Sequence, residues 1–274
     1  MRALGVALAA LLAGCGGPQA PADADLARAG IDRSSYTAPG GLRVSLLSQR
    51  AADGRRVIFI HGTPGSAAAW AHYLRLPLPG TEAVAIDRPG FGLTLPPGAM
   101  VALKAQAAAI APLLVERGGK WPVLVGHSLG GPIAAQVAVD NPGRVGALLI
   151  LAGSFDPALE KINPMQPVGE WRMIRALLPA NLRNANRELL GLKPELAALA
   201  PRLSGLRCRI SIIHGTKDDL VPYANVAFLR AHLTGAAAVD VTTLKGQNHF
   251  IVWNEETRVR AALAALLAAS SPAC

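Results

Sequence analysis

The chain has 274 residues, of which 51% are hydrophobic and 16% are charged, so it can fill a sizeable core. This composition excludes a largely disordered chain and fits one large α/β domain or two small ones. The formal net charge is +9 at pH 7. Because the Lys and Arg residues are scattered and form no dense basic run with interleaved aromatic residues, we expect no binding to nucleic acid.

The N-terminus has the pattern of a bacterial export signal. A positive charge precedes an apolar run over residues 3–13, which is too short to span a bilayer, since a span takes about 20 residues. The stretch Leu12-Ala-Gly-Cys15 resembles the lipobox of bacterial lipoproteins, which implies cleavage before Cys15 and lipid on its thiol. The alternative is an ordinary signal peptide that contains a cysteine by chance.

We therefore expect a lipoprotein signal peptide over residues 1–14, followed by a Pro-, Ala- and Gly-rich tether over residues 15–41. The protein would then be exported and held by its lipid at a membrane of the cell envelope.

From residue 42 onward, apolar runs that suit buried strands alternate with stretches that suit helices. The predicted strands span residues 43–47, 56–60, 81–86, 122–125, 144–151, 208–213 and 239–244. The predicted helices between them span residues 66–74, 103–116, 129–140, 222–232 and 254–269. This alternation predicts an α/β fold with a doubly wound, mostly parallel sheet over residues 42–153 and 207–274.

Residues 154–206 interrupt the alternation, because they contain no good strand. Prolines separate three helical stretches in this segment, at residues 168–178, 181–190 and 194–203. Ligands bind at the carboxyl ends of the strands in open α/β folds, so we expect a small helical lid at that edge. Its apolar stripe is expected to pack on the body of the domain, and a lid packed in this way would also line a pocket for an apolar group beneath it. The stripe consists of Val168, Trp171, Ile174, Leu177 and Leu178.

Three cysteines are present. If Cys15 carries lipid, Cys208 and Cys274 remain, and an exported protein can join such a pair in a disulfide. Cys208 opens an apolar run and Cys274 is the last residue, so the sequence favours a buried thiol and a loose terminal thiol instead. The sequence contains no Cys-x-x-Cys motif and no cluster of His and Cys residues, so it gives no indication of a metal site.

The pattern Gly-x-Ser-x-Gly at residues 126–130 joins an apolar strand to a helix. Small residues on both sides of the serine allow a sharp turn that exposes its hydroxyl above the sheet. The helix that follows directs its free N–H groups towards the same place. Ser128 is therefore the candidate nucleophile.

A serine nucleophile needs a base, and three histidines follow Ser128 in the chain. His214 ends an apolar strand and His232 lies inside a predicted helix, so we expect both to have packing or surface roles. His249 lies in a polar turn after the last strand, from which a base can reach over the sheet. His249 is therefore the candidate base.

The base in turn needs an orienting acid, for which the residues alone leave three candidates. Asp218 and Asp219 lie in the turn after the predicted strand at 208–213, where either could instead cap the next helix. Asp156 follows the predicted strand at 144–151.

Together these patterns resemble the α/β-hydrolase superfamily over residues 42–269, through motifs that occur in the same order. The motifs are HGTPG at 61–65, DRPGFG at 87–92, GHSLG at 126–130, GTKDDLVP at 215–222 and GQNHF at 246–250. The resemblance implies that Asp218 is the acid. It also implies that the backbone N–H groups of Thr63 and Leu129 form an oxyanion hole, and that the DRPGFG loop supports the site without reacting.

The resemblance implies an esterase-like serine hydrolase that cleaves a carboxylic ester or related acyl bond of a small molecule through an acyl-enzyme. It implies no cofactor and no metal. Serine at the nucleophile position argues against the related epoxide hydrolases and haloalkane dehalogenases, which use aspartate there. Two alternatives stay open: a peptidase or amidase of the same fold, and a non-catalytic lipoprotein that only binds.

Overall fold

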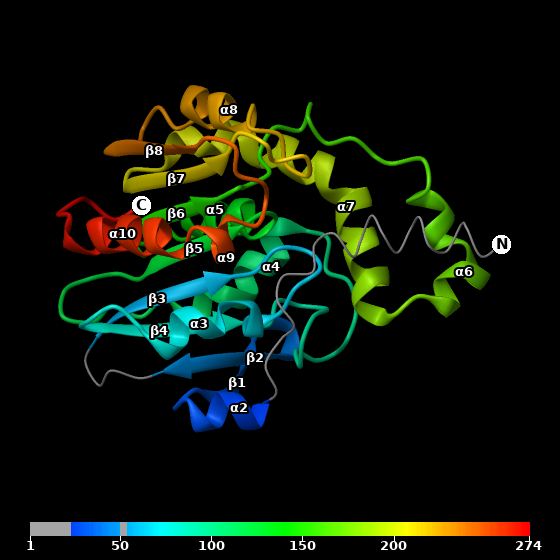
Figure 1. Ribbon diagram of the computed structural model, residues 1–274, viewed down its shortest axis with the longest axis horizontal. Coiled ribbons are helices and arrows are strands. Elements are labelled where there is room, and N and C mark those ends of the chain that lie inside the picture. The colour runs from blue at the N-terminus through cyan, green and yellow to red at the C-terminus, as the bar shows by residue number, and fades with distance from the viewer. Residues whose placement is uncertain (1–22, 50–53) are drawn as a thin grey trace.

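An eight-stranded sheet forms the centre of the protein in a computed structural model that describes residues 23–49 and 54–274 (Figure 1). The strands are β1 (Asp32–Ala38), β2 (Leu42–Gln49), β3 (Arg55–Ile60), β4 (Thr81–Ile86), β5 (Val123–His127), β6 (Ala147–Leu151), β7 (Arg209–Gly215) and β8 (Ala238–Leu244). Their order across the sheet is β1-β2-β4-β3-β5-β6-β7-β8. The strands from β3 to β8 pair in parallel, whereas β2 is antiparallel to both of its neighbours. The predicted doubly wound, mostly parallel α/β fold is therefore confirmed.

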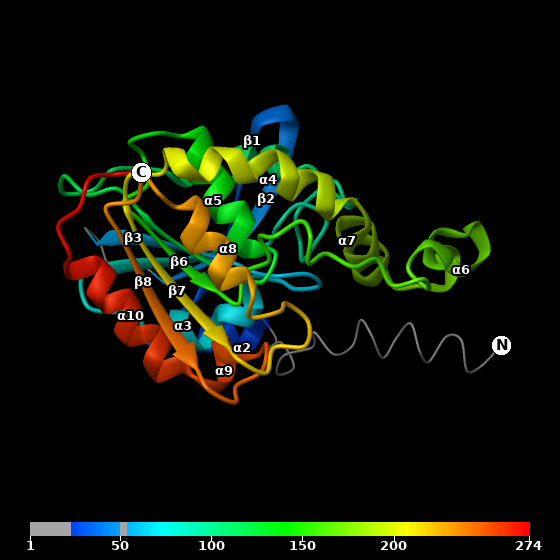
Figure 2. The same ribbon diagram turned by 90° about the horizontal axis from the view of Figure 1, so that it is seen from above.

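Helices cover both faces of the sheet (Figure 2). The α-helices are α2 (Asp23–Arg28), α3 (Ala71–Arg75), α4 (Leu103–Ile110), α5 (Gly130–Asp140), α6 (Arg172–Leu177), α7 (Ala180–Leu199), α8 (Asn225–His232), α9 (Ile251–Asn254) and α10 (Glu256–Ala268). The 3₁₀ turns are η1 (Pro39–Gly41), η2 (Ala67–Trp70), η3 (Ala111–Leu113), η4 (Pro167–Glu170) and η5 (Ala200–Gly205). One core joins α4, α5 and α8 to the sheet, and a second core joins α2, α3, α9 and α10 to its other face. This double cover explains why β4, β5 and β6 are buried at every residue.

The folded domain begins earlier than the sequence indicated. β1 pairs with β2 along its whole length, and Leu26 of α2 is buried in a core. Part of the predicted tether over residues 15–41 is therefore helix and edge strand. The strand β1 was not predicted because its sequence is mostly polar and lacks an apolar pattern. An edge strand does not need apolar alternation. The predicted signal peptide, 1–14, and Cys15 lie outside the described residues.

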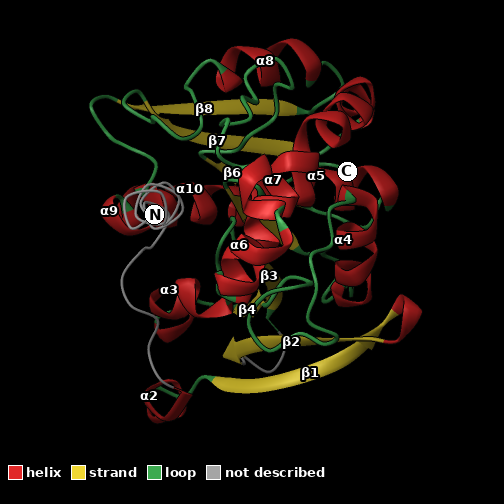
Figure 3. Ribbon diagram, turned by 90° about the vertical axis from the view of Figure 1, so that its right-hand side faces the viewer, coloured by secondary structure: helices red, strands yellow, loops and turns green. Residues whose placement is uncertain are grey.

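The interrupted segment does form a helical insertion between β6 and β7, and it lies beyond the carboxyl ends of the strands. Figure 3 shows α6 and α7 in front of the middle of the sheet. The two helices expected on either side of Pro194 are a single helix, α7, with the proline inside it. Leu192, Leu196 and Leu199 are all buried, so one apolar face continues past the proline and holds the helix together. No helix among residues 23–49 and 54–274 is long and apolar enough to cross a bilayer.

Cys208 and Cys274 form a disulfide, so the expectation of two free thiols is wrong. The backbone brings the two cysteines together: Cys208 directly precedes β7, and the N–H of Cys274 donates to the carbonyl of Val145 near β6 at 2.7 Å. The last residue is thus fixed to the sheet. Sequence reasoning missed the bond because the path of a chain after its last helix leaves no periodic pattern.

Reduction of this disulfide is expected to destabilise the protein. The bond closes a loop with a sequence separation of 66 residues, and the chain-entropy model assigns about 4 kcal/mol to a loop of that length. Thermal melting with and without a reductant measures the loss. The double variant C208A/C274A is the control, since a reductant should not shift its melting temperature further. An unchanged melting temperature of the wild type on verified reduction would contradict the prediction.

Candidate active site

Ser128 lies in the turn between β5 and α5, where its φ of 55° is in the left-handed region. A side chain at Gly126 would overlap the carbonyl of Gly130, and one at Gly130 would overlap the carbonyl of Ile60. Only glycine fits at these two positions, which explains the Gly-x-Ser-x-Gly pattern. The strained serine is held by a hydrogen bond from its N–H to the carbonyl of Leu151, at 2.9 Å.

His249 and Asp218 are joined by a hydrogen bond of 2.7 Å from Nδ1 to Oδ2. The side chain of Asp218 is fully buried, and its other oxygen accepts the N–H groups of Leu220 and Val221. Burial by itself would raise the pKa of Asp218. Its contacts with His214 and His249 outweigh burial and hold the pKa well below its usual value. With Nδ1 donating to a carboxylate, Nε2 of His249 is left to accept a proton.

The structure separates the three acid candidates. Asp219 is exposed at the cavity wall, and Asp156 accepts the backbone N–H of Ala158 at 2.8 Å. Of the three, Asp218 is the one in contact with His249. The other two histidines that follow Ser128 have different contacts from His249. His214 is buried against the carbonyl of Val221, and His232 bonds the carbonyl of Phe228 within α8.

The loop that contains Thr63 crosses directly in front of the serine. A side chain at Gly62 would come within 2.8 Å of Cβ of Ser128, so only glycine allows this approach. The N–H groups of Thr63 and Leu129 donate to no other group among residues 23–49 and 54–274. Both residues line the same cavity as Ser128. Two free donors therefore flank the serine, where an oxyanion would need them.

The carbonyl of Gly62 belongs to the same peptide unit as the N–H of Thr63, and two side chains hold it. Nδ1 of His61 donates to it at 2.7 Å and Nη2 of Arg88 at 2.9 Å. Because the peptide unit is planar, fixing its carbonyl also fixes the direction of the Thr63 N–H.

Arg88 is fully buried, and it also forms a two-pronged ion pair with Glu188 of α7. Its two terminal nitrogens lie 2.7 and 3.0 Å from the carboxylate oxygens of Glu188. Gln106 of α4 bonds both partners, at 2.6 Å to Arg88 and 2.9 Å to Glu188. The helical insertion is thereby connected to the loop that presents the Thr63 N–H.

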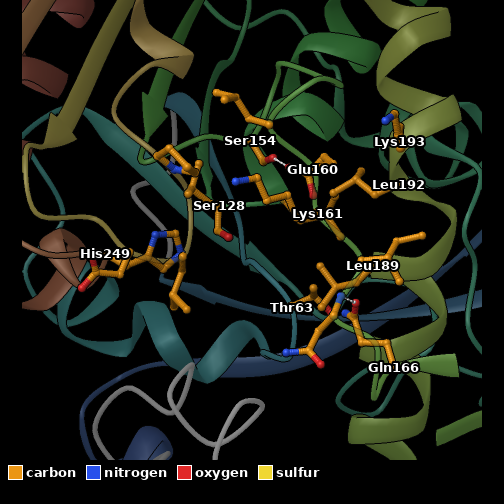
Figure 4. Close-up of a pocket in the computed structure, with 18 residues that line it drawn as sticks. Thr63, Ser128, Ser154, Glu160, Lys161, Gln166, Leu189, Leu192, Lys193 and His249 are labelled. Atoms are coloured by element: carbon orange, nitrogen blue, oxygen red, sulfur yellow. Dashed lines mark hydrogen bonds between the residues drawn. The ribbon is translucent and has the colours of Figure 1, made fainter. Parts of the chain in front are cut away.

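A cavity of about 420 Å³ opens at Ser128 (Figure 4). Thr63, Ser128, Leu129 and His249 line its inner end. The outer walls come from the insertion and from the turn before α8. They are lined by Leu159, Glu160, Lys161, Ile162, Asn163, Gln166, Leu189, Leu192, Lys193, Asp219, Leu220, Val221 and Pro222, with Ser154 beside them.

The apolar stripe predicted to line the pocket does not do so. Trp171 is 65% exposed and Leu177 is 86% exposed, and no residue of the stripe borders the cavity. The six-residue helix α6 stands beyond α7 and away from the sheet, so its residues cannot reach the serine (Figure 2). The wall is apolar through Leu159, Ile162 and the α7 leucines instead.

The family model described as "Alpha/beta hydrolase family" matches residues 57–272. The chain belongs to the alpha/beta hydrolase family. This alpha/beta hydrolase contains, among residues 23–49 and 54–274, no cluster of three or more His, Cys, Asp or Glu side chains that could hold a metal ion.

The similar proteins include several enzyme types. The chain is 28% identical to the dihydrolipoyllysine-residue acetyltransferase component of the acetoin cleaving system of Cupriavidus necator, over 68% of its own length but only 57% of that protein's. It is 38% identical to the lipase LipV of Mycobacterium tuberculosis over 38% of each chain. A carboxylesterase structure from Nitrososphaera gargenis has a TM-score of 0.67 at 20% identity, covering 86% of this chain and 98% of that one. The family and its lipase- and esterase-like members support a hydrolytic function.

Sequence reasoning missed three residues at the site of this alpha/beta hydrolase. His127 donates from Nε2 to the backbone carbonyl of His249 at 3.1 Å. Burial and the neighbouring His249 lower the pKa of His127 to about 3, so it stays neutral and holds the His249 backbone. Arg88 and Glu188 form the buried pair described above. Arg88 and His127 did leave a signal, as the second residues of the DRPGFG and GHSLG motifs, whereas Glu188 lies in no motif.

The contrast between Asp218 and Asp219 gives a prediction with an internal control. D218N removes the carboxylate bonded to His249 and is expected to lower kcat by about 10⁴, because the imidazole loses its orienting charge. D219N changes an exposed neighbour and should leave kcat nearly unchanged. Steady-state turnover of a chromogenic ester measures both. The opposite ranking would assign the acid to Asp219.

Proposed function

We propose that this protein is a serine hydrolase that cleaves carboxylic esters through an acyl-enzyme. The observation that carries the proposal is the buried hydrogen bond between Asp218 and His249, in the cavity that also contains the strained Ser128. Nucleophile, base and acid come from three separate segments, and packing alone does not require them to meet at one cavity.

The geometry supports a definite order of events. Nε2 of His249 accepts the Ser128 proton while the serine oxygen attacks the acyl carbon, and Asp218 stabilises the imidazolium through Nδ1. The N–H groups of Thr63 and Leu129 hold the oxyanion that develops on the carbonyl oxygen. His249 then protonates the leaving alcohol, and water hydrolyses the acyl-enzyme by the same route in reverse. Every step uses groups of this chain and water.

A fluorophosphonate probe separates this enzyme from a non-catalytic binding protein. The probe should label the wild type at Ser128, identified by mass spectrometry of the modified peptide. S128A is the matched negative control, and S154A, which changes another serine of the same cavity, should label as the wild type does. A wild type that takes up no probe would overturn the proposal.

The cavity lining indicates which esters fit. Leucine and isoleucine side chains form much of the wall, so an apolar acyl chain should be favoured. Each buried methylene contributes up to about 0.8 kcal/mol, which is up to about fourfold in kcat/KM. With p-nitrophenyl esters we expect kcat/KM to rise from acetyl to butyryl or hexanoyl. A strict preference for acetyl would contradict the apolar pocket and leave Ser128 as nucleophile, and an amide series run in parallel distinguishes an amidase.

We further propose that the mature protein is held at a membrane of the cell envelope by lipid on Cys15. The support is the lipobox-like Leu12-Ala-Gly-Cys15 at the end of an apolar run. Multiple acyl chains anchor a protein firmly, whereas a single chain binds only marginally. C15S should make the protein extractable from membranes by a high-salt wash, which weakens peripheral electrostatic contacts, whereas the lipid-anchored wild type should resist the wash. C15S that resists the wash as the wild type does would refute the lipid anchor.

A further inference from the structure

The helix α6 exposes large apolar side chains that nothing in the described fold covers. Trp171, Met173 and Leu177 are 65%, 83% and 86% exposed. They lie within seven residues of one another, and α6 stands at the outer end of the insertion, away from the sheet (Figure 2). Single exposed apolar residues are ordinary, but a group of three on one projecting helix and the residue directly before it indicates a contact surface. We call Trp171, Met173 and Leu177 the α6 tip.

The surroundings of the α6 tip are basic. Residues 171–187 include no Asp or Glu but four arginines, at positions 172, 175, 183 and 187. The nearest acid in sequence, Glu170, is already bonded to Asn186 and Arg187. Arg172, Arg175 and Arg183 form no ion pair with any residue in 23–49 or 54–274. Arg172 and Arg175 belong to the same short helix as the tip, which therefore combines exposed apolar side chains with positive charge.

We propose that the α6 tip docks on an anionic lipid surface. Exposed Trp, Met and Leu enter the boundary between head groups and acyl chains, while arginines beside them bind lipid phosphates. The positive charge fits an anionic membrane and opposes a second copy of this chain, because facing tips would bring arginines together. Membrane contact through α6 is independent of any lipid on Cys15.

Docking in this way would place the cavity at the lipid surface. The segment before α6 contributes Leu159, Ile162 and Gln166 to the cavity wall, and α7 after it contributes Leu189 and Leu192. The insertion thus has the cavity on its inner side and the α6 tip on its outer side. An acyl substrate drawn from a membrane would have a short path to Ser128, which is the part of the inference that rests on the proposed function.

Vesicle sedimentation tests the surface without depending on catalysis. The full chain carrying C15S, and so free of lipid, is mixed with vesicles of phosphatidylcholine alone or with added phosphatidylglycerol. We expect preferential binding to the anionic vesicles, which the variant W171S/M173S/L177S should weaken by at least about tenfold. A matched control, L76S/L93S/V115S, removes three exposed apolar side chains elsewhere and should bind as the parent does.

Charge variants and a soluble substrate complete the test. R172Q/R175Q should abolish the preference for anionic vesicles, and all variants should hydrolyse a soluble short-chain ester at the parental rate. Equal binding by parent and W171S/M173S/L177S would overturn the inference, and so would equal losses in that variant and the matched control. Size-exclusion chromatography that shows a parent dimer broken by the α6 substitutions would instead assign the tip to protein contact. Vesicle binding without ester turnover would overturn only the proposed function.

Discussion

Replacing Ser128 or His249 by alanine is expected to abolish ester turnover, with a fall in kcat of about 10⁴ or more. In the proposed mechanism the Ser128 hydroxyl forms the acyl-enzyme and Nε2 of His249 accepts its proton. Nδ1 of His249 is already bonded to Asp218 at 2.7 Å. Because the two residues act as one unit, the double variant should be no slower than either single variant. Burst kinetics with a chromogenic ester measure all three.

Matched controls distinguish loss of chemistry from loss of structure. S154A changes a different serine of the cavity, and H232A changes a histidine of α8 that bonds only within its own helix. Both should retain turnover within a few-fold of the wild type. Ester turnover by S128A at more than a small fraction of the wild-type rate would show that another group is the nucleophile.

The second large effect is expected at the buried pair of Arg88 and Glu188. R88M or E188M alone leaves one charge in the interior without its partner, which costs about 3–5 kcal/mol of the free energy of unfolding. Chemical denaturation measures this loss. The same R88M change frees the Gly62 carbonyl from one of its two donors, so the Thr63 N–H is held less firmly.

The double variant R88M/E188M separates these two roles. Apolar side chains of similar volume should restore most of the stability, since no unpaired charge remains. They cannot restore the bond to the Gly62 carbonyl, so kcat should remain reduced. Removing a whole oxyanion donor lowers kcat by about 10²–10³. Because His61 still holds the Gly62 carbonyl, we expect a smaller fall in kcat, with little change in KM. A stable double variant with wild-type kcat would limit Arg88 to a structural role.

The parts of the fold that the sequence predicted are those that depend on local pattern. Seven strands were expected at nearly their observed positions, because most of them contain a run of buried apolar residues. β1 escaped notice because its seven residues, DRSSYTA, are mostly polar. Pro194 was expected to end a helix, but the buried leucines on both sides outweigh the lost hydrogen bond.

The same distinction applies to the candidate site, where residues in local motifs were predicted and residues paired over long sequence distances were not. Ser128, Asp218 and His249 lie in turns whose neighbouring residues form recognisable motifs. The sequence alone could therefore identify them as candidates. The Arg88–Glu188 pair joins residues 100 positions apart. No motif around Glu188 in α7 predicts a buried ion pair, so the sequence could not reveal it. The lid stripe was predicted from helical spacing, which identifies an apolar face but does not say what the face contacts. Trp171 and Leu177 of that stripe are exposed, and its other three residues are half-buried.

The fixed C-terminus determines how the protein can be attached to a solid support. Cys274 is bonded to Cys208 ahead of β7, and its backbone bonds Val145 ahead of β6. Both contacts lie at the amino ends of the parallel strands, whereas Ser128 and its cavity follow the carboxyl end of β5. The helix α6 lies on this carboxyl side as well (Figure 1). A linker fused after Cys274 would therefore orient every immobilised molecule with its cavity facing the solution. It would also leave the α6 tip free to meet vesicles flowing over the surface.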